Sequence, residues 1–376
     1  MARLLPEVCN IQYGFPFDSS KFSVSEGMPI IRIRDVLRGY SETFTTQKFD
    51  ENYIVKDGDI LIGMDGEFNI AKWGKQPALL NQRVCRLFPK DNIDADYLFY
   101  FLQGTLKKIE DRTAFATVKH LSAKELNKIA IPFPPVEEQK RIGKALNKTN
   151  ELISCRKEQL VKLDELVKAR FVEMFGDCKI NPKQWKTVEL EKISEVGSSK
   201  RVFVEELKEE GIPFYRGTEI GALAEGKSII PELFITEEHY QELCEASGKP
   251  KIGDLLMPSI CPDGRIWVVN TEKPFYFKDG RVLWVHSIKS GYNHTFLLYT
   301  LKDRITTDYL SIASGTTFAE LKIFALKKCK VFDVPIDLQN QFAAFVEQTE
   351  KIKAEVQKSL DELETLKKSL MQKYFG

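Results

Sequence analysis

The sequence predicts an α+β protein built from two similar globular domains, each followed by one long helix. Three observations lead to this prediction. The chain repeats itself with an offset of 200 residues, and each copy ends in a stretch of about 40 residues with a helical apolar stripe. Its 376 residues are also more than one ordinary domain contains. We therefore expect globular domains at 1–134 and 177–334, with long helices at 135–176 and 335–376.

The repeat is clearest in the two predicted helices. Residues 132–176 align without a gap on residues 332–376, with identical pairs at Pro135/Pro335, Gln139/Gln339, Thr149/Thr349, Leu160/Leu360, Leu163/Leu363, Leu166/Leu366, Lys168/Lys368, Phe175/Phe375 and Gly176/Gly376. Shorter stretches upstream also correspond: Pro29–Asp35 with Pro213–Glu219, Asp57–Ile62 with Ile252–Met257, and Tyr97–Leu102 with Phe296–Leu301. The globular domains are therefore expected to be copies of one fold, with loops of unequal length.

Each long segment carries apolar residues in alternating steps of three and four, which is the pattern of a coiled coil. The stripe consists of Ile142, Leu146, Ile153, Leu160, Leu163 and Val167 in the first segment, and of Phe342, Val346, Val356, Leu360, Leu363 and Leu370 in the second. Pro135 and Pro335 are expected at the first helical positions, and Gly176 just past the end of the first helix. Forty residues make roughly 60 Å of helix at about 1.5 Å per residue. The stripe is too long for one small domain to cover, so the two helices are expected to pair antiparallel about a pseudo-twofold axis.

Composition excludes several classes of protein. The chain has 55 Lys and Arg against 54 Asp and Glu, so it is not a bulk polycation, and any basic face on it must be local. It shows no apolar run long enough for a membrane span and no hydrophobic core of a signal peptide. Its seven cysteines are scattered without a C-x-x-C pair, which argues against a disulfide framework or a zinc site. These features predict a soluble, reduced, cytoplasmic protein without a bound metal.

Two patterns resemble catalytic motifs by chance. Residues 221–228 match the P-loop pattern, but Ile229, Ile230 and Pro231 follow where a P-loop needs a helix, so a turn between strands is expected there. Pro262-Asp263 and the distant Glu320-x-Lys322 would form only a weak nuclease pattern. We therefore expect no catalytic site, and a self-sufficient nuclease or NTPase stays as the alternative from another class, beside a coiled-coil scaffold without a role on DNA.

The candidate function is nucleic-acid binding by both globular domains. Arginine presents a planar fork that can bind guanine bidentately or hold a phosphate, and amide side chains can read adenine. The candidates are Arg32, Arg34, Asn69, Lys72, Asn81 and Arg83 in the first domain, and Arg216, Arg265 and Arg281 in the second. Residues suited to base contact stand nearby in the sequence: Phe68, Trp73, Gln82, Tyr215 and Trp267. Two similar domains on a twofold bar would suit two half-sites about one DNA turn, roughly 34 Å, apart.

These residues together resemble the specificity (S) subunit of type I restriction–modification systems, over the whole chain. The resemblance rests on Ile131–Ile142 leading into a long helix, its degenerate copy Val334–Gln339, and the stretches Ile30–Asp35, Gly58–Gly66 and Leu80–Val84. It implies that each globular domain is a target recognition domain reading one half of a bipartite, asymmetric DNA site. The second domain departs from the pattern at Cys261–Gly264, as domains that read different bases would.

The resemblance also implies partners and cofactors. The paired helices would dock two modification (methyltransferase) subunits, and restriction subunits would join the complex on double-stranded DNA. This chain would bind no cofactor, since S-adenosylmethionine, ATP and Mg²⁺ would be used by the other subunits. A specificity chain of a bifunctional restriction–modification enzyme is the alternative within the same class.

Overall fold

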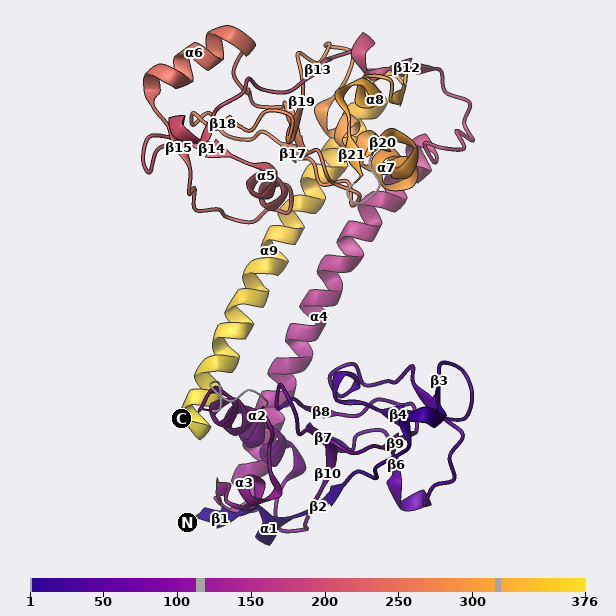
Figure 1. The fold of residues 1–376 in the computed structure, drawn as a ribbon, viewed down its shortest axis with the longest axis vertical. Coiled ribbons are helices and arrows are strands. Elements are labelled where there is room, and N and C mark those ends of the chain that lie inside the picture. The colour runs from indigo at the N-terminus through magenta and orange to yellow at the C-terminus, as the bar shows by residue number, and fades with distance from the viewer. Residues whose placement is uncertain (1, 113–118, 315–318) are drawn as a thin grey trace. The chain divides into compact units, whose positions relative to one another are not determined.

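The computed structural model of the chain describes residues 2–112, 119–314 and 319–376. The chain divides into two compact units. Met1–Glu158 and Gln357–Gly376 form the first unit, and Gln159–Val356 forms the second. Helices α4 (Val136–Phe175) and α9 (Ile336–Phe375) each run without interruption from one unit into the other. Every unit therefore contains one globular domain and one segment of each long helix (Figure 1).

The first globular domain consists of small β-sheets, two short helices and one longer helix. Its strands are β1 (Ala2–Leu4), β2 (Cys9–Tyr13), β3 (Phe22–Ser23), β4 (Met28–Ile31), β5 (Phe44–Thr45), β6 (Ile54–Val55), β7 (Ile60–Gly63), β8 (Ile70–Lys72), β9 (Ala78–Leu80), β10 (Val84–Pro89) and β11 (Ala130–Pro132). Its helices are α1 (Leu5–Val8), α2 (Ala95–Arg112) and α3 (Ala123–Asn127). The sheets have the orders β2-β10-β7-β8, β3-β5-β4-β9-β6 and β1-β11.

The second globular domain repeats this plan. Its strands are β12 (Thr187–Glu189), β13 (Glu195–Gly197), β14 (Ile212–Tyr215), β15 (Phe234–Ile235), β16 (Leu255–Pro258), β17 (Trp267–Val268), β18 (Tyr276–Phe277), β19 (Val282–His286), β20 (Ala313–Ser314), β21 (Glu320–Leu321) and β22 (Lys330–Phe332). Its helices are α5 (Gly217–Ala224), α6 (Glu237–Ser247), α7 (His294–Ile312) and α8 (Ile323–Lys327). The order β13-β19-β16-β17 matches β2-β10-β7-β8, and the parallel pair β14-β18 matches β4-β9. The predicted internal repeat is thus confirmed in the sheet topology.

The repeated Gly-Asp sequence has the same role in both domains. Gly58 and Gly253 have φ angles of +84° and +91°, which favour glycine. The aspartate after each glycine accepts a backbone hydrogen bond, from Lys56 at 2.8 Å and from Lys251 at 2.9 Å. The same carboxylate also binds a side chain from the neighbouring strand, which is Arg86 on β10 and Trp284 on β19. The same Gly-Asp turn therefore occurs in both domains, although the side chain that donates to its aspartate differs.

The ends of the long helices pack into the cores of the globular domains. In the first unit, Ile142 and Leu146 of α4 belong to the core beneath α2, and Phe375 of α9 packs against that core. In the second unit, Phe171 and Phe175 of α4 and Phe342 of α9 pack against the core helix α7. In each unit the start of one long helix lies beside the end of the other, so α4 and α9 run antiparallel.

Contacts along the helices confirm the antiparallel pairing inside each unit. In the first unit, Lys367 Nζ donates to Asn150 Oδ1 at 2.9 Å, and Arg156 Nε donates to Ser359 Oγ at 3.2 Å. In the second unit, Lys353 Nζ lies 2.8 Å from Asp164 Oδ1. The predicted stripe residues are all buried or half-buried: Ile142, Leu146, Ile153, Leu160, Leu163, Val167, Phe342, Val346, Val356, Leu360, Leu363 and Leu370.

The start of each long helix is fixed to its globular domain by a buried glutamine. Gln139 Oε1 accepts the backbone N–H of Asp94 at 2.9 Å, and its Nε2 donates to the carbonyl of Pro134 at 2.9 Å. Gln339 Oε1 accepts the backbone N–H of Asn293 at 2.9 Å. Its Nε2 donates to the carbonyls of Val334 at 2.8 Å and Gly291 at 3.1 Å. We name Gln139 and Gln339 the latch glutamines.

Both helices begin one residue later than predicted, at Val136 and Ile336. Pro135 and Pro335 precede the helices, and their carbonyls accept the first helical hydrogen bonds, from Gln139 and Gln339. A proline fits this flanking position because it loses no hydrogen bond there. At the other end, Gly176 follows α4 with a φ angle of +85°, as predicted for a helix-ending glycine.

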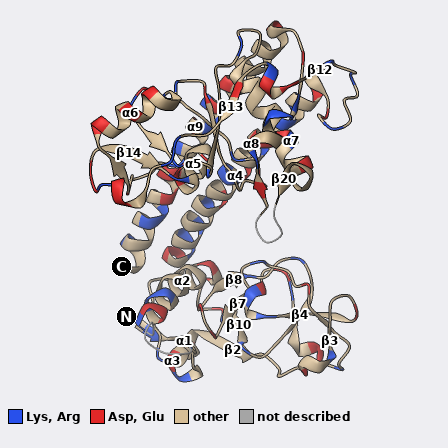
Figure 2. Cartoon of the chain, turned by 45° about the horizontal axis from the view of Figure 1, so that its top comes forward, with Lys and Arg blue, Asp and Glu red and all other residues tan. Residues whose placement is uncertain are grey.

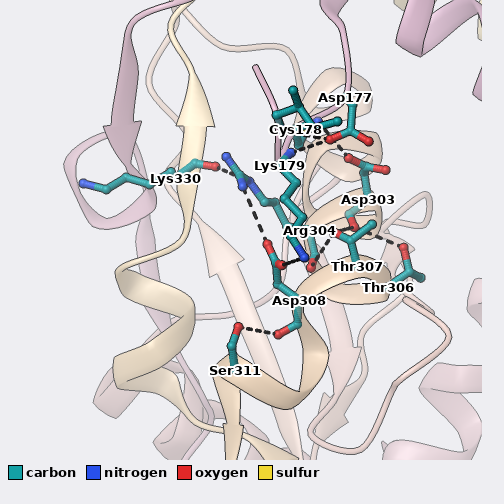
Figure 3. Close-up of polar contacts among 11 residues, drawn as sticks. Asp177, Cys178, Lys179, Asp303, Arg304, Thr306, Thr307, Asp308, Ser311 and Lys330 are labelled. Carbon is teal, nitrogen blue, oxygen red and sulfur yellow. Dashed lines mark hydrogen bonds and ion pairs between the residues drawn. The ribbon is translucent and has the colours of Figure 1, made fainter. Parts of the chain in front are cut away.

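The chain leaving α4 is tied to α7 by the polar cluster in Figure 3. The backbone N–H of Cys178 donates to Asp303 Oδ2 at 3.2 Å, and Lys179 Nζ lies 3.4 Å from Asp308 Oδ1. Asp308 is the residue at which α7 departs from helical geometry. Arg304 links the same region to β22 by donating from Nε to the carbonyl of Lys330 at 3.2 Å. These contacts fix the second globular domain to the end of α4.

All seven cysteines are free thiols, and five of them are buried. Burial raises the pKa of Cys9 to about 11. Within the described part of the chain, none of the helices combines the length and apolarity that crossing a bilayer would demand.

Candidate nucleic-acid interface

Two of the candidate arginines occupy the same position in the two domains. Arg32 follows β4 and Arg216 follows β14, each immediately before a helical turn. The backbone N–H of Arg32 donates to Asp35 Oδ2 at 2.9 Å, and that of Arg216 donates to Glu219 Oε2 at 2.8 Å. An acidic residue three positions after the arginine therefore caps the turn in both copies. The Arg32 side chain is exposed, while Arg216 lies against Glu219 and Glu232.

The ion pair with Arg216 changes the acidity of Glu219. Burial would raise the pKa of this carboxyl, but hydrogen bonds from the side chain and backbone of Arg216 outweigh it and lower the pKa to about 2. Glu219 is therefore ionised at neutral pH and holds the Arg216 guanidinium beside α5.

A second pair of candidate arginines also matches. Arg83 is the residue immediately before β10, and Arg281 is the residue immediately before β19. Arg83 has a φ angle of +73°. The carbonyl of Arg83 accepts the N–H of Met64 at 2.8 Å, and the carbonyl of Arg281 accepts the N–H of Ser259 at 2.9 Å. Each side chain is paired with a carboxylate: Arg83 NH1 lies 2.8 Å from Asp65 Oδ2, and Arg281 contacts Glu320.

In the second domain, the three candidate arginines line one cavity of about 670 Å³. Its walls are mainly apolar, and Arg216, Arg265, Lys278 and Arg281 supply the positive charges around it. Arg265 Nε lies 2.8 Å from Asp263 Oδ2. The cavity is within the size range of ligand sites in proteins, and its cations belong to residues separated widely in the sequence.

The remaining candidates of the first domain lie in different surroundings. Arg34 is exposed and lies 3.7 Å from Asp35. Asn69 Nδ2 donates to Glu67 Oε2 at 3.4 Å, and Lys72 forms an ion pair with Asp96. Asn81 is buried, and its Oδ1 has no hydrogen-bond partner among the described residues.

The structure corrects the expected role of three aromatic residues. Phe68, Trp73 and Trp267 are almost completely buried in the cores, so they cannot stack on a base at the surface. Trp73 Nε1 donates to the carbonyl of Gln76 at 2.6 Å, which satisfies its polar group internally. Tyr215 is half-buried and stacks on Phe275 with ring centroids 5.2 Å apart.

The P-loop-like stretch does not have the expected conformation. We expected a turn between strands, but Gly221 lies inside α5, and the helix ends at Ala224. Residues 227–233 form neither helix nor strand, so no helix N-terminus follows Lys227 and Ser228. Asp263 and Glu320, the acids of the nuclease-like pattern, both pair with arginines at the cavity.

Charge is distributed unevenly on the second domain. Helix α6 carries Glu237, Glu238, Glu242 and Glu245 and no Lys or Arg, so red segments but no blue ones interrupt its tan ribbon in Figure 2. Such a helix repels phosphate groups. The candidate arginines Arg216 and Arg281 lie elsewhere in the domain, immediately before α5 and β19.

Sequence reasoning missed several residues that surround the candidate arginines of the two domains. In the first domain, Asp65 contacts Arg83, and His120 contacts Asp65. In the second domain, Lys278 lines the cavity and Lys322 contacts Glu320, which the sequence analysis considered only as part of a nuclease-like pattern. Their roles depend on contacts between distant segments. No group of three or more His, Cys, Asp or Glu side chains suited to a metal ion occurs in the part of the chain that the structure describes.

Comparison with known proteins agrees with the repeated architecture. The family described as "Type I restriction modification DNA specificity domain" matches residues 2–165 and again residues 182–365. The chain belongs to this family. The two matches correspond to the two copies of the repeat, each with most of its long helix.

Curated relatives are specificity subunits as well. The type I restriction enzyme EcoBI specificity subunit of Escherichia coli is 39% identical over 166 residues, which span 44% of this chain and 35% of the relative. The MjaVIII specificity subunit of Methanocaldococcus jannaschii is 24% identical over 383 residues, spanning 91% of this chain and 87% of the relative. The chain therefore spans only about a third of the length of the EcoBI subunit, but most of the length of the MjaVIII subunit.

Solved structures of the family share the fold. The S subunit of the type I restriction–modification system from M. genitalium has a TM-score of 0.60 at 16% identity, covering 100% of this chain and 96% of that chain. A chain from a study of complex assembly and conformational transition of the type I system has a TM-score of 0.59 at 18% identity, with coverage of 100% and 97%. The α+β fold with a repeated domain and long paired helices is therefore the fold of specificity subunits.

Proposed function

We propose that this chain is the DNA-recognition subunit of a type I restriction–modification system and reads a bipartite, asymmetric site with its two globular domains. The observation that carries the proposal is the repeated arginine framework. Arg32 corresponds to Arg216, and Arg83 corresponds to Arg281, with the same backbone hydrogen bonds in each pair. The neighbouring side chains differ between the domains, as two readers of different half-sites require.

We propose further that the chain itself catalyses no reaction. Its partners would be two methyltransferase subunits, restriction subunits and double-stranded DNA, and the partner subunits would use S-adenosylmethionine, ATP and Mg²⁺. The names of the relatives support this assignment, since they are specificity subunits of restriction enzymes. The nearly balanced charge of the chain also fits a reader that depends on partners for much of its affinity for phosphates.

Methylation mapping with arginine variants tests the proposal. The chain is assembled with its methyltransferase subunit, and the methylated sites are read by whole-genome sequencing of modified bases. We expect one bipartite site, in which Arg83→Ala relaxes one half and Arg281→Ala relaxes the other, each by about 1–3 kcal/mol of discrimination.

Arg38→Ala is the matched control, because Arg38 is an exposed arginine of the first domain that is paired with Glu42 and lies outside the candidate set. This variant should leave the site unchanged. A single continuous recognition site, or relaxation of the same half by Arg83→Ala and Arg281→Ala, would contradict the proposed function.

A further inference from the structure

We propose that Glu320 and Asp65 are specificity-determining positioning residues, which orient Arg281 and Arg83 toward base edges and reduce their attraction for phosphates. This inference rests on the proposed function and adds to it a role for two carboxylates. It predicts that removal of either negative charge makes binding to DNA stronger but less selective.

The two arginines lie in the same backbone framework. The N–H of Met64 donates to the carbonyl of Arg83, and the carbonyl of Met64 accepts the N–H of Leu121 at 2.7 Å. In the second domain, Ser259 makes the same two bonds with Arg281 and Leu321, the latter also at 2.7 Å. The arginine side chains therefore start from equivalent points in the two domains.

The carboxylates that hold these arginines come from different positions in the repeat. Asp65 follows β7, whereas Glu320 lies on β21. Position 120, which corresponds to Glu320, is a histidine in the first domain, and this histidine contacts Asp65. The two domains thus preserve an arginine–carboxylate pair although the sequence position of the carboxylate has changed.

Each carboxylate is held more firmly than its arginine. Asp65 and Glu320 are 20% and 23% exposed, whereas Arg83 and Arg281 are 54% and 60% exposed. A second group braces each acid, His120 on Asp65 and Lys322 on Glu320, the latter at 2.9 Å. Stability is a poor reason for these pairs, because exposed ion pairs contribute only about 0–1 kcal/mol.

Specific recognition of DNA gives a better reason. A carboxylate that occupies one side of the guanidinium leaves the other donors in a fixed direction, which suits the bidentate contact with guanine O6 and N7. The same negative charge lowers the attraction of the arginine for phosphates, and that attraction is independent of sequence. The acid therefore raises the ratio of specific to non-specific affinity.

Binding of the assembled complex to two DNA duplexes tests this inference. One duplex carries the methylated site found by mapping, and the other is a scrambled duplex of equal length. We expect Glu320→Gln to strengthen binding to the scrambled duplex about three- to tenfold and to lower the specificity ratio by a similar factor. The slope of log K against log salt should steepen by about 0.9, the value for one additional phosphate contact.

Coupling to the arginine shows whether Glu320 acts through Arg281. Glu320→Gln should have no effect on the specificity ratio when Arg281 is already alanine. The control is Glu189→Gln, because Glu189 is 25% exposed and also binds two lysines, Lys328 and Lys330, in the same domain. This variant changes the net charge equally and should leave the specificity ratio unchanged.

Two outcomes separate this inference from the proposed function. If Arg281→Ala lowers the specificity ratio and Glu320→Gln leaves the ratio and the salt slope unchanged, the positioning role is refuted and the proposed function stands. If the unmodified complex does not distinguish the two duplexes, the proposed function fails. Asp65→Asn supplies an independent variant in the first domain and is expected to relax the other half-site.

Discussion

Replacing the latch glutamine Gln339 by leucine should strongly destabilise the second unit. The change removes three hydrogen bonds, to the N–H of Asn293 and to the carbonyls of Val334 and Gly291. The bond to Val334 is buried, so loss of its partner carries the full cost of an unsatisfied buried carbonyl, about 1–3 kcal/mol. The other two bonds are partly buried, with a cost of about 1 kcal/mol each. We therefore expect Gln339→Leu to lower the free energy of unfolding by about 3–5 kcal/mol.

Urea denaturation and amide hydrogen exchange measure this effect at two levels. Denaturation gives the loss of stability, and exchange at Asn293 reports whether its N–H has lost protection. Gln139→Leu removes only two partly buried bonds and should cost less, about 2 kcal/mol. Gln341→Leu is the control, because Gln341 is an exposed residue on the same helix. Equal unfolding free energies for Gln339→Leu and Gln341→Leu would refute the reasoning.

Three further changes test the packing and the electrostatics. Glu219→Gln should lower the free energy of unfolding by about 1–3 kcal/mol at pH 7. Because the folded pKa of Glu219, about 2, lies below the ordinary 4.5, its stabilisation is complete above pH 4.5 and disappears as the pH falls toward 2. Denaturation at several pH values measures this dependence. Gly143→Ala should destabilise the first unit by about 1–3 kcal/mol, since the added Cβ would lie 2.7 Å from Asp94 Oδ1. The Cβ of Gly104→Ala would meet its nearest atom at an ordinary 3.6 Å, so this variant should stabilise α2 by about 0.5–1 kcal/mol. Thermal unfolding measures both effects. Leu360→Ala should cost about 2–4 kcal/mol because Leu360 is buried, and the same change at the exposed Leu366 should cost less than about 1 kcal/mol; equal midpoints for these two variants would count against the helix pairing.

The long helices and the duplication were predictable because they depend on patterns within short stretches. The alternating three- and four-residue spacing determines which side of a helix is apolar, and the structure buries or half-buries that side along α4 and α9. Identical residues at a constant offset revealed two copies of one fold. The start of each helix was predicted to within one residue from the proline that precedes it.

The surface of the globular domains was less predictable because it depends on contacts between distant segments. Arg281 and Glu320 are 39 residues apart in the chain, and the sequence around neither residue predicts their contact. Trp73 and Trp267 were misjudged because short, irregular strands give too little alternation to distinguish a buried face from an exposed one. The pair Gln139/Gln339 was visible as an identity, but its function became clear only when the backbone groups around it were in place.

The latch glutamines have a consequence for how such chains can exchange parts during evolution. Gln139 and Gly143 contact the Asp94 region of the domain that precedes them, so the first turns of α4 are matched to that domain. A crossover between two related genes at Pro135 would join the globular domain of one protein to the first helical turns, including the latch glutamine, of the other. A crossover farther along the helix would transfer the domain together with its own anchor. Viable hybrids with altered sequence preference should therefore carry their junctions inside the helices rather than at the domain borders.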